Sequence, residues 1–108
     1  MNQQVKVISI SGSFNANNSQ SFRESITESM DSGTSIVLVD CHNVTFMDSS
    51  GLGTLVLTFK ALEESGIKMV ICSINEQVRM LFELTGIDSK FTIVPSKEAF
   101  ENLLISAT

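Results

Sequence analysis

The chain has no tryptophan and no tyrosine, and among its 108 residues it has one proline, one histidine and two cysteines. Cys41 and Cys72 do not form a Cys-x-x-Cys pair, and the single histidine, His42, cannot supply the three or four converging ligands that zinc requires. We therefore expect no metal site, no disulfide and no bound cofactor. Each cysteine follows an apolar run, which is typical of a small buried thiol, and we predict His42 to be a surface turn residue.

Basic residues are few and scattered. Seven basic against twelve acidic residues give a formal net charge of -5, and no cluster of lysine and arginine occurs in the sequence. Nucleic acid is therefore not an expected partner. The apolar runs are far shorter than a membrane span, and the N-terminus lacks the character of a signal peptide. We expect a cytoplasmic protein that does not insert into a membrane.

No linker, repeat or shift in composition divides the chain, and 43% of its residues are hydrophobic. This length and composition are sufficient for one core, so residues 1–108 are predicted to form a single domain.

Short apolar runs alternate along the chain with segments of helical periodicity. The predicted strands are the run from Val5 that ends at Gly12, Ile36–Val39, Val44–Met47, Lys68–Cys72 and Phe91–Val94, with a polar break over 41–43. The predicted helices carry apolar faces made of Phe22, Ile26 and Met30; Leu52, Leu55, Val56, Phe59 and Leu62; Val78, Leu81, Phe82 and Thr85; and Ala99, Phe100, Leu103 and Leu104. Alternation of this kind predicts right-handed crossovers and a largely parallel sheet. Ser73 with Glu76 has the spacing of a capping box for the third helix, and Ser96 is the predicted cap of the fourth.

The hexapeptide Asp48-Ser49-Ser50-Gly51-Leu52-Gly53 lies where an apolar run gives way to helical periodicity. The free N–H groups at the start of a helix bind anions, and they also donate hydrogen bonds to Asp or Ser side chains. The residues alone therefore leave two interpretations open. The turn is either a simple helix cap or a place that carries or senses a phosphate.

Catalysis and nucleotide binding are not expected from this sequence. Ser49 does not lie in a Gly-x-Ser-x-Gly elbow, and His42 has no evident orienting partner. There is also no P-loop and no Gly-x-Gly-x-x-Gly sequence, so Gly51-Leu52-Gly53 is better explained by tight packing between a strand and a helix.

The ten residues from Val44 to Gly53, VTFMDSSGLG, resemble the STAS family of anti-anti-sigma factors, the anti-sigma factor antagonists. The stretch from Val78 to Ile87, a helix followed by glycine, is similar to that family as well. The resemblance implies an α/β fold with a small mixed, largely parallel β-sheet of about four to five strands and about four helices packed mainly on one face. It also implies a phosphorylatable binding module and not an enzyme.

Partners and residue roles follow from the same resemblance. In the family, an anti-sigma factor with a histidine-kinase-like ATPase fold phosphorylates the serine after the motif aspartate, and a metal-dependent serine/threonine phosphatase reverses the reaction. By this correspondence Ser49 is the phosphate acceptor, and the two glycines let the partner approach the backbone closely. The residues expected to contact the partner are Asn15, Met47, Asp48, Ser49, Ser50, Gly51, Leu52 and Gly53. The alternative is a STAS scaffold subunit of a transporter or signalling assembly that is never phosphorylated.

The N-terminal part departs from the family pattern. Members commonly begin with a hairpin and a Gly-x-Leu-Asp turn, whereas here Phe14-Asn15 follows Gly12-Ser13. We therefore expect the family's opening strand to be missing or very short. Asn15 is expected to keep the turn chemistry of the usual acidic residue without its charge.

Overall fold

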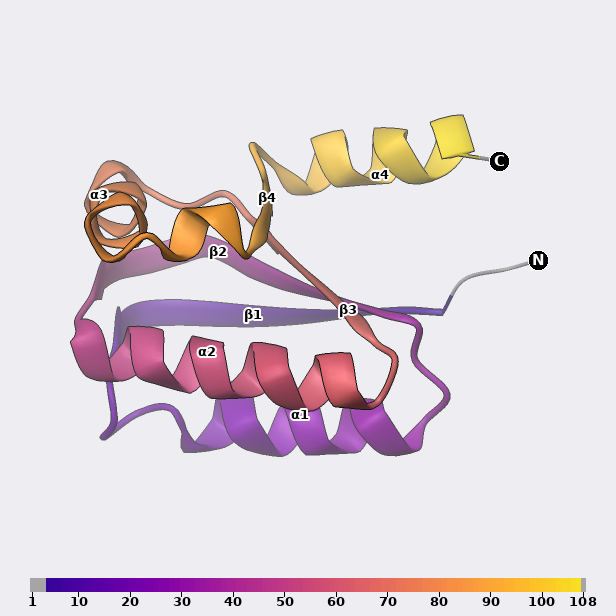
Figure 1. The fold of residues 1–108 in the computed structure, drawn as a ribbon, viewed down its shortest axis with the longest axis horizontal. Helices are drawn as coiled ribbons and strands as arrows, with labels where there is room; N and C mark the ends of the chain where they lie inside the picture. Colours follow the sequence, from indigo (N-terminus) through magenta and orange to yellow (C-terminus); the bar gives the residue numbers. More distant parts are fainter. Residues whose placement is uncertain (1–3, 108) are drawn as a thin grey trace.

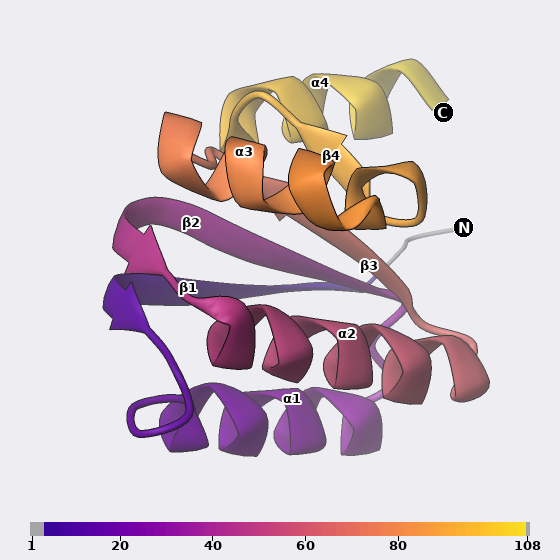
Figure 2. The ribbon, with the colours of Figure 1, turned by 60° about the vertical axis from the view of Figure 1, so that its left-hand side comes forward.

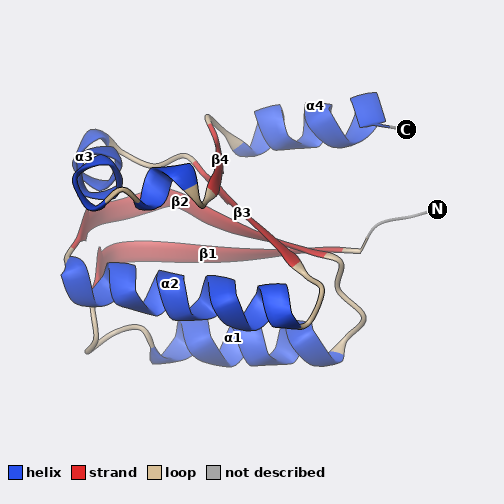
Figure 3. Ribbon diagram, in the orientation of Figure 1, coloured by secondary structure: helices blue, strands red, loops and turns tan. Residues whose placement is uncertain are grey.

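The computed structural model describes residues 4–107, in which strands and helices alternate. The elements are β1 (Val5–Phe14), α1 (Gln20–Asp31), β2 (Ile36–Met47), α2 (Ser49–Glu64), β3 (Lys68–Cys72), α3 (Glu76–Thr85), the short 3-10 helix η1 (Ile87–Ser89), β4 (Thr92–Val94) and α4 (Lys97–Ala107). The four strands form one sheet in the order β1-β2-β3-β4, and each neighbouring pair is parallel (Figures 1 and 3). The prediction of a small, largely parallel sheet is confirmed.

Helices cover the two faces of the sheet unequally. Because successive residues of a strand point to opposite faces, Val37 and Val39 lie on one face while Ile36 and Leu38 lie on the other. The first face packs against α1, α2 and α3 in the larger core cluster, and the second packs against α4 through Phe100. Figure 2 shows α4 on the opposite side of the strands from α1 and α2. Three of the four helices thus share one face, as the family resemblance implies.

The sequence predicted a polar break over 41–43, but β2 runs through it as one strand of 12 residues. Its pairing with β1 shifts twice, because the steps Ser9 to Ser11 and Gly12 to Ser13 each oppose a longer step on β2. Such bulges place extra residues in one strand and increase its twist. Burial therefore recurs at every third residue, at Cys41, Val44 and Met47. His42 is exposed, but it lies in this strand and not in a turn.

The first strand is longer than predicted. Gly12 takes a positive φ of 71°, yet β1 does not stop there and continues to Phe14, which is 1% exposed. The Phe14 ring packs edge-on against Phe22 of α1, with 5.3 Å between ring centroids. This contact fastens the end of β1 to the first helix.

The predicted capping box of α3 is wrong. Asn75, not Ser73, is the N-cap, and its Oδ1 accepts a hydrogen bond from the Val78 amide at 2.9 Å. The Asn75 side-chain amide also donates to the carbonyl oxygens of Val44 and Thr45. Ser73 adopts a positive φ of 61° before the helix begins. Asn75 therefore both caps α3 and ties it to β2.

The fourth helix follows its predicted cap but not its whole predicted inner face. Ser96 Oγ accepts a hydrogen bond from the Ala99 amide at 3.0 Å, which confirms the cap. Phe100 is buried and Leu104 is partly buried, whereas Leu103 is 59% exposed. The helix thus packs on the sheet through a narrower stripe than the sequence suggested.

Both cysteines are free thiols and both are buried, as predicted. Burial raises the pKa of Cys41 to about 12, which leaves this thiol protonated at neutral pH.

The start of α2 lies directly against the end of β1. A Cβ atom added at Gly51 would lie 2.2 Å from the Phe14 carbonyl oxygen, whereas one added at Gly53 would meet nothing within 4 Å. Only glycine fits at position 51, because neither the strand nor the helix can move aside without losing its other contacts.

We predict that Gly51→Ala lowers the free energy of unfolding by about 2 kcal/mol or more, because the added methyl group overpacks a backbone contact. The matched control, Gly53→Ala, should leave stability unchanged or raise it by up to about 1 kcal/mol, since alanine is the better helix former. Urea denaturation followed by circular dichroism measures both. Equal effects of the two substitutions would contradict the close contact.

Candidate functional site

Asp48 joins the last residue of β2 to α2 and caps the helix. Its backbone is extended, and its Oδ1 accepts hydrogen bonds from the Gly51 amide at 2.9 Å and from Ser50 Oγ at 2.7 Å. These two bonds favour the charged carboxylate and lower the pKa of Asp48. The cap therefore contributes stability that is present above the ordinary pKa of an aspartate and is lost as the pH falls through the lowered pKa of the folded state.

The Ser50 hydroxyl is bonded on both sides. Besides donating to Asp48, its Oγ accepts a hydrogen bond from the Ala16 amide at 3.0 Å. Ala16 lies in the loop between β1 and α1, 34 residues earlier in the chain. Ser50 thus bridges the helix cap and this loop.

Ser49 is the first residue of α2, and its side chain is exposed. Among the described residues, its hydroxyl makes no hydrogen bond, in contrast to the side chains of Asp48 and Ser50 on either side. The structure therefore leaves one free hydroxyl at the entrance of the helix, and it belongs to the predicted phosphate acceptor.

The loop from β1 to α1 is held by its own asparagines. Asn15 Oδ1 accepts a hydrogen bond from the Asn17 amide, and Asn18 Oδ1 accepts one from the Asn15 amide, both at 2.8 Å. The Asn18 side-chain amide also donates to the Ser13 carbonyl oxygen. Asn15 keeps the turn chemistry that the sequence predicted, and its loop lies beside Ser50 through Ala16.

Several residues predicted as partner contacts are buried. Met47 is 0% exposed, so the prediction that it contacts a partner is wrong: its side chain belongs to the core. Leu52 is 7% exposed and packs mainly in the same core. Gly51 allows a close backbone approach, but the approaching backbone is that of Phe14 in the same chain. The accessible part of the predicted site is Ser49 and Ser50, while Asn15, Asp48 and Gly53 are half-buried.

The sequence analysis did not identify the role of Gln77 in α3, whose side chain holds the backbone at the end of β2. Its side chain accepts a hydrogen bond from the Met47 amide at 2.9 Å and donates one to the Met47 carbonyl oxygen at 2.8 Å. An exposed-looking glutamine 30 residues away gives no local signal of this role. The pair of bonds fixes the backbone immediately before Asp48.

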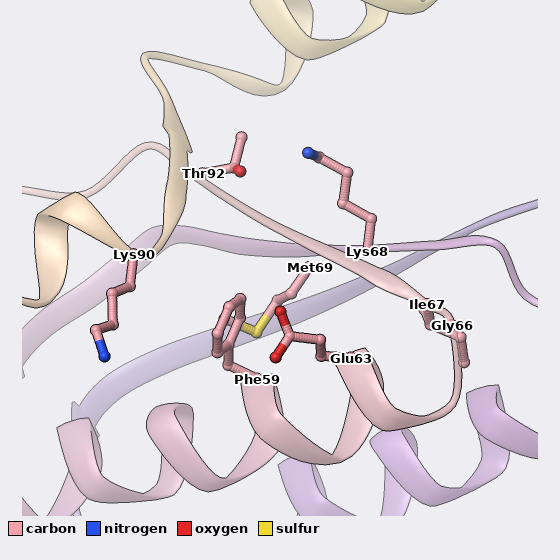
Figure 4. A pocket seen from close by; sticks show the side chains of 8 residues that line it. All are labelled: Phe59, Glu63, Gly66, Ile67, Lys68, Met69, Lys90 and Thr92. Atoms are coloured by element: carbon pink, nitrogen blue, oxygen red, sulfur yellow. The ribbon is translucent and has the colours of Figure 1, made fainter.

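A hollow of about 380 Å³ lies away from this site, between the second half of α2 and the first residues of β3 and β4. Phe59 and Met69 form its apolar part, with the Glu63 carboxylate beside them. Figure 4 shows the Lys68 ammonium group directed up toward Thr92 and the Lys90 ammonium group directed down, away from it. The two cations do not converge on a common point, so the hollow is no anion site. Within residues 4–107 there is also no group of three or more metal-binding side chains and no helix with the length and hydrophobicity of a membrane span.

The sequence is similar to a known domain family and to named bacterial proteins. The profile of the STAS domain family matches residues 1–100. The anti-sigma-B factor antagonist of Staphylococcus aureus is 38% identical over 64 residues, which span 59% of this chain and 59% of that protein. The alignment thus covers well under two thirds of the curated relative.

Solved structures share the fold over nearly the whole chain. A putative anti-sigma factor antagonist from Thermotoga maritima superposes with a TM-score of 0.79 at 25% identity, covering 91% of this chain and 86% of that one. The STAS domain of a SulP transporter from Vibrio cholerae gives 0.78 at 22% identity, with coverages of 100% and 88%. The fold, the motif at the start of α2 and the match over residues 1–100 agree: the chain belongs to the STAS domain family.

Proposed function

We propose that this protein is an anti-sigma factor antagonist controlled by phosphorylation of Ser49. Unmodified, it binds an anti-sigma factor that is also a serine kinase with a histidine-kinase-like ATPase fold; phosphorylated, it releases that partner. A serine/threonine phosphatase resets it. The observation that carries the proposal is the exposed hydroxyl of Ser49, which makes no hydrogen bond to any residue that the structure describes, whereas the side chains of Asp48 and Ser50 are both bonded.

The hydrogen bonds favour Ser49 over Ser50 as the acceptor. Transfer of a phosphoryl group to Ser50 requires the loss of its bonds to Asp48 and to the Ala16 amide. Ser49 gives up no bond within the described residues and is already accessible to a kinase. The two adjacent hydroxyls are therefore chemically alike but structurally different.

A phosphate on Ser49 acts on the binding surface more than on the fold. It adds about -1.5 to -2 charges at a helix N-terminus, where the helix dipole favours an anion. Asp48 already accepts the hydrogen bond of the Gly51 amide, so a phosphate on Ser49 would have to compete with Asp48 for that donor. Burying such an anion against a partner without a matching cation costs a few kcal/mol, enough to reduce occupancy by orders of magnitude.

A scaffold role is the alternative, since the fold is shared with a transporter STAS domain. A scaffold has no need of a free hydroxyl at the helix entrance, and this is why we favour the switch. Transfer of phosphate to Ser49 by a kinase is expected for the switch and not for the scaffold, so a phosphorylation assay distinguishes the two roles.

The first test is to incubate the protein with ATP and the kinase and to locate the phosphate by mass spectrometry. We expect modification at Ser49 only, and no modification of Ser49→Ala. The matched control, Ser50→Ala, keeps the acceptor and should still be modified at Ser49. Phosphate on Ser50, or an unmodified protein that still binds the kinase tightly, would speak against the switch.

The second test mimics the modified state. Ser49→Glu should weaken kinase binding at least about tenfold, while the thermal midpoint changes by no more than about 4 °C, as expected for an exposed substitution. Ser35→Glu adds the same charge at an exposed serine before β2, at the other end of that strand, and should leave binding unchanged. Isothermal titration calorimetry and a melting curve give both values. Loss of the fold in Ser49→Glu would show that the hydroxyl is not free.

A further inference from the structure

β1 forms one edge of the sheet and leaves half of its backbone without a partner. The strand is ten residues long, and among the described strands it pairs with β2 alone. In a parallel pair, every second residue directs its N–H and C=O groups away from the neighbouring strand. Within residues 4–107, no other strand pairs with these outward groups over 5–11. Beyond this stretch Gly12 takes a positive φ and the Ser13 carbonyl oxygen accepts a hydrogen bond from the Asn18 side chain, so the unpaired edge ends there.

This edge lacks the features that normally prevent pairing between molecules. Exposed edges are usually short, bulged, or guarded by charges and proline. The opposite edge strand, β4, has only three residues. β1 has no proline and a single charged residue, Lys6, and the extra residues of both bulges lie on β2. The solvent-exposed face of β1 carries Val7, which is 38% exposed, and the exposed Ser9 and Ser11.

We propose that β1 pairs antiparallel with β1 of a second copy of this chain, so that the two sheets become one continuous sheet. A second copy fits because it carries the same unpaired groups, and one contact satisfies both edges at once. A foreign partner needs an unpaired strand of its own.

The sequence of β1 is compatible with itself in this arrangement. Residues opposite each other in an antiparallel pair point to the same face, so a two-fold axis at Ser9 sets Ile8 opposite Ile10 and Val7 opposite Ser11. Lys6 then faces Gly12, and no like charges oppose each other. The pairing does not involve Ser49 and is independent of the proposed phosphorylation.

Light scattering after size exclusion tests the proposal on the whole chain. We expect a mass of twice 11.8 kDa that falls toward the monomer value on dilution. Ser9→Lys brings two ammonium groups face to face and should weaken the dimer about fivefold, and Ser9→Glu should do the same. An equimolar mixture of the two variants should restore the dimer, because opposite charges then meet.

Ser65→Lys is the matched control, since it adds the same charge at an exposed serine after α2 and should leave the dimer unchanged. Should Ser9→Lys fail to fold, Ser9→Glu, which also meets its own copy across the two-fold axis, serves in its place, with Ser65→Glu as its control. A monomer at every concentration, or variants whose mixture dimerises no better than either alone, would overturn the pairing.

Discussion

The contact between Gly51 and the Phe14 carbonyl oxygen is the constraint on which the site depends. It brings the first turn of α2 against the end of β1, although the two segments are separated by a strand and a helix in the sequence. Because the two segments lie so close, the Asp48 amide donates a hydrogen bond to the Phe14 carbonyl oxygen at 3.4 Å, and the Ala16 amide donates one to the Ser50 hydroxyl. The site is therefore the junction of two neighbouring parallel strands at their carboxyl ends, where α/β sheets commonly place functional groups.

The three consecutive residues Asp48, Ser49 and Ser50 have different roles at this junction. Asp48 caps the helix and Ser50 bridges to the loop before α1, so both are committed to the fold. Ser49 contributes no side-chain bond within the described residues and is free to change its charge. Because the structural bonds belong to its neighbours, a modification of Ser49 changes what a partner meets without removing a contact that the fold needs. Under the proposed function, this separation would let a phosphate on Ser49 alter affinity while the domain stays folded.

Local patterns in the sequence were sufficient where a structure is made by neighbouring residues. The start of α2 at the hexapeptide, the periodicity of α2 and the cap at Ser96 all depend on residues within one or two turns. One local prediction failed, because the cap of α3 is Asn75 and not Ser73. The other failures concern contacts between distant segments. The polar residues around His42 were interpreted as a break between two strands. They belong to one strand with bulges, and a bulge is defined by its pairing with a partner strand, which no local pattern reveals. Met47 was expected at the surface for its place beside the motif, but the bulges of β2 turn it into the core, where Gln77 of α3 holds its backbone.

The direction of the strands decides how the two proposed surfaces relate to each other. Ser49 follows the carboxyl end of β2, and β1 runs parallel to β2. In a dimer that pairs its β1 strands antiparallel, the two Ser49 hydroxyls therefore lie at opposite ends of the continuous sheet. Each proposed phosphorylation site would then lie away from the two-fold axis, so the dimer contact would not cover it. If both proposals hold, dimerisation through β1 would change the stoichiometry of the complex and leave the two Ser49 sites separate, so that the phosphate would remain the determinant of partner choice.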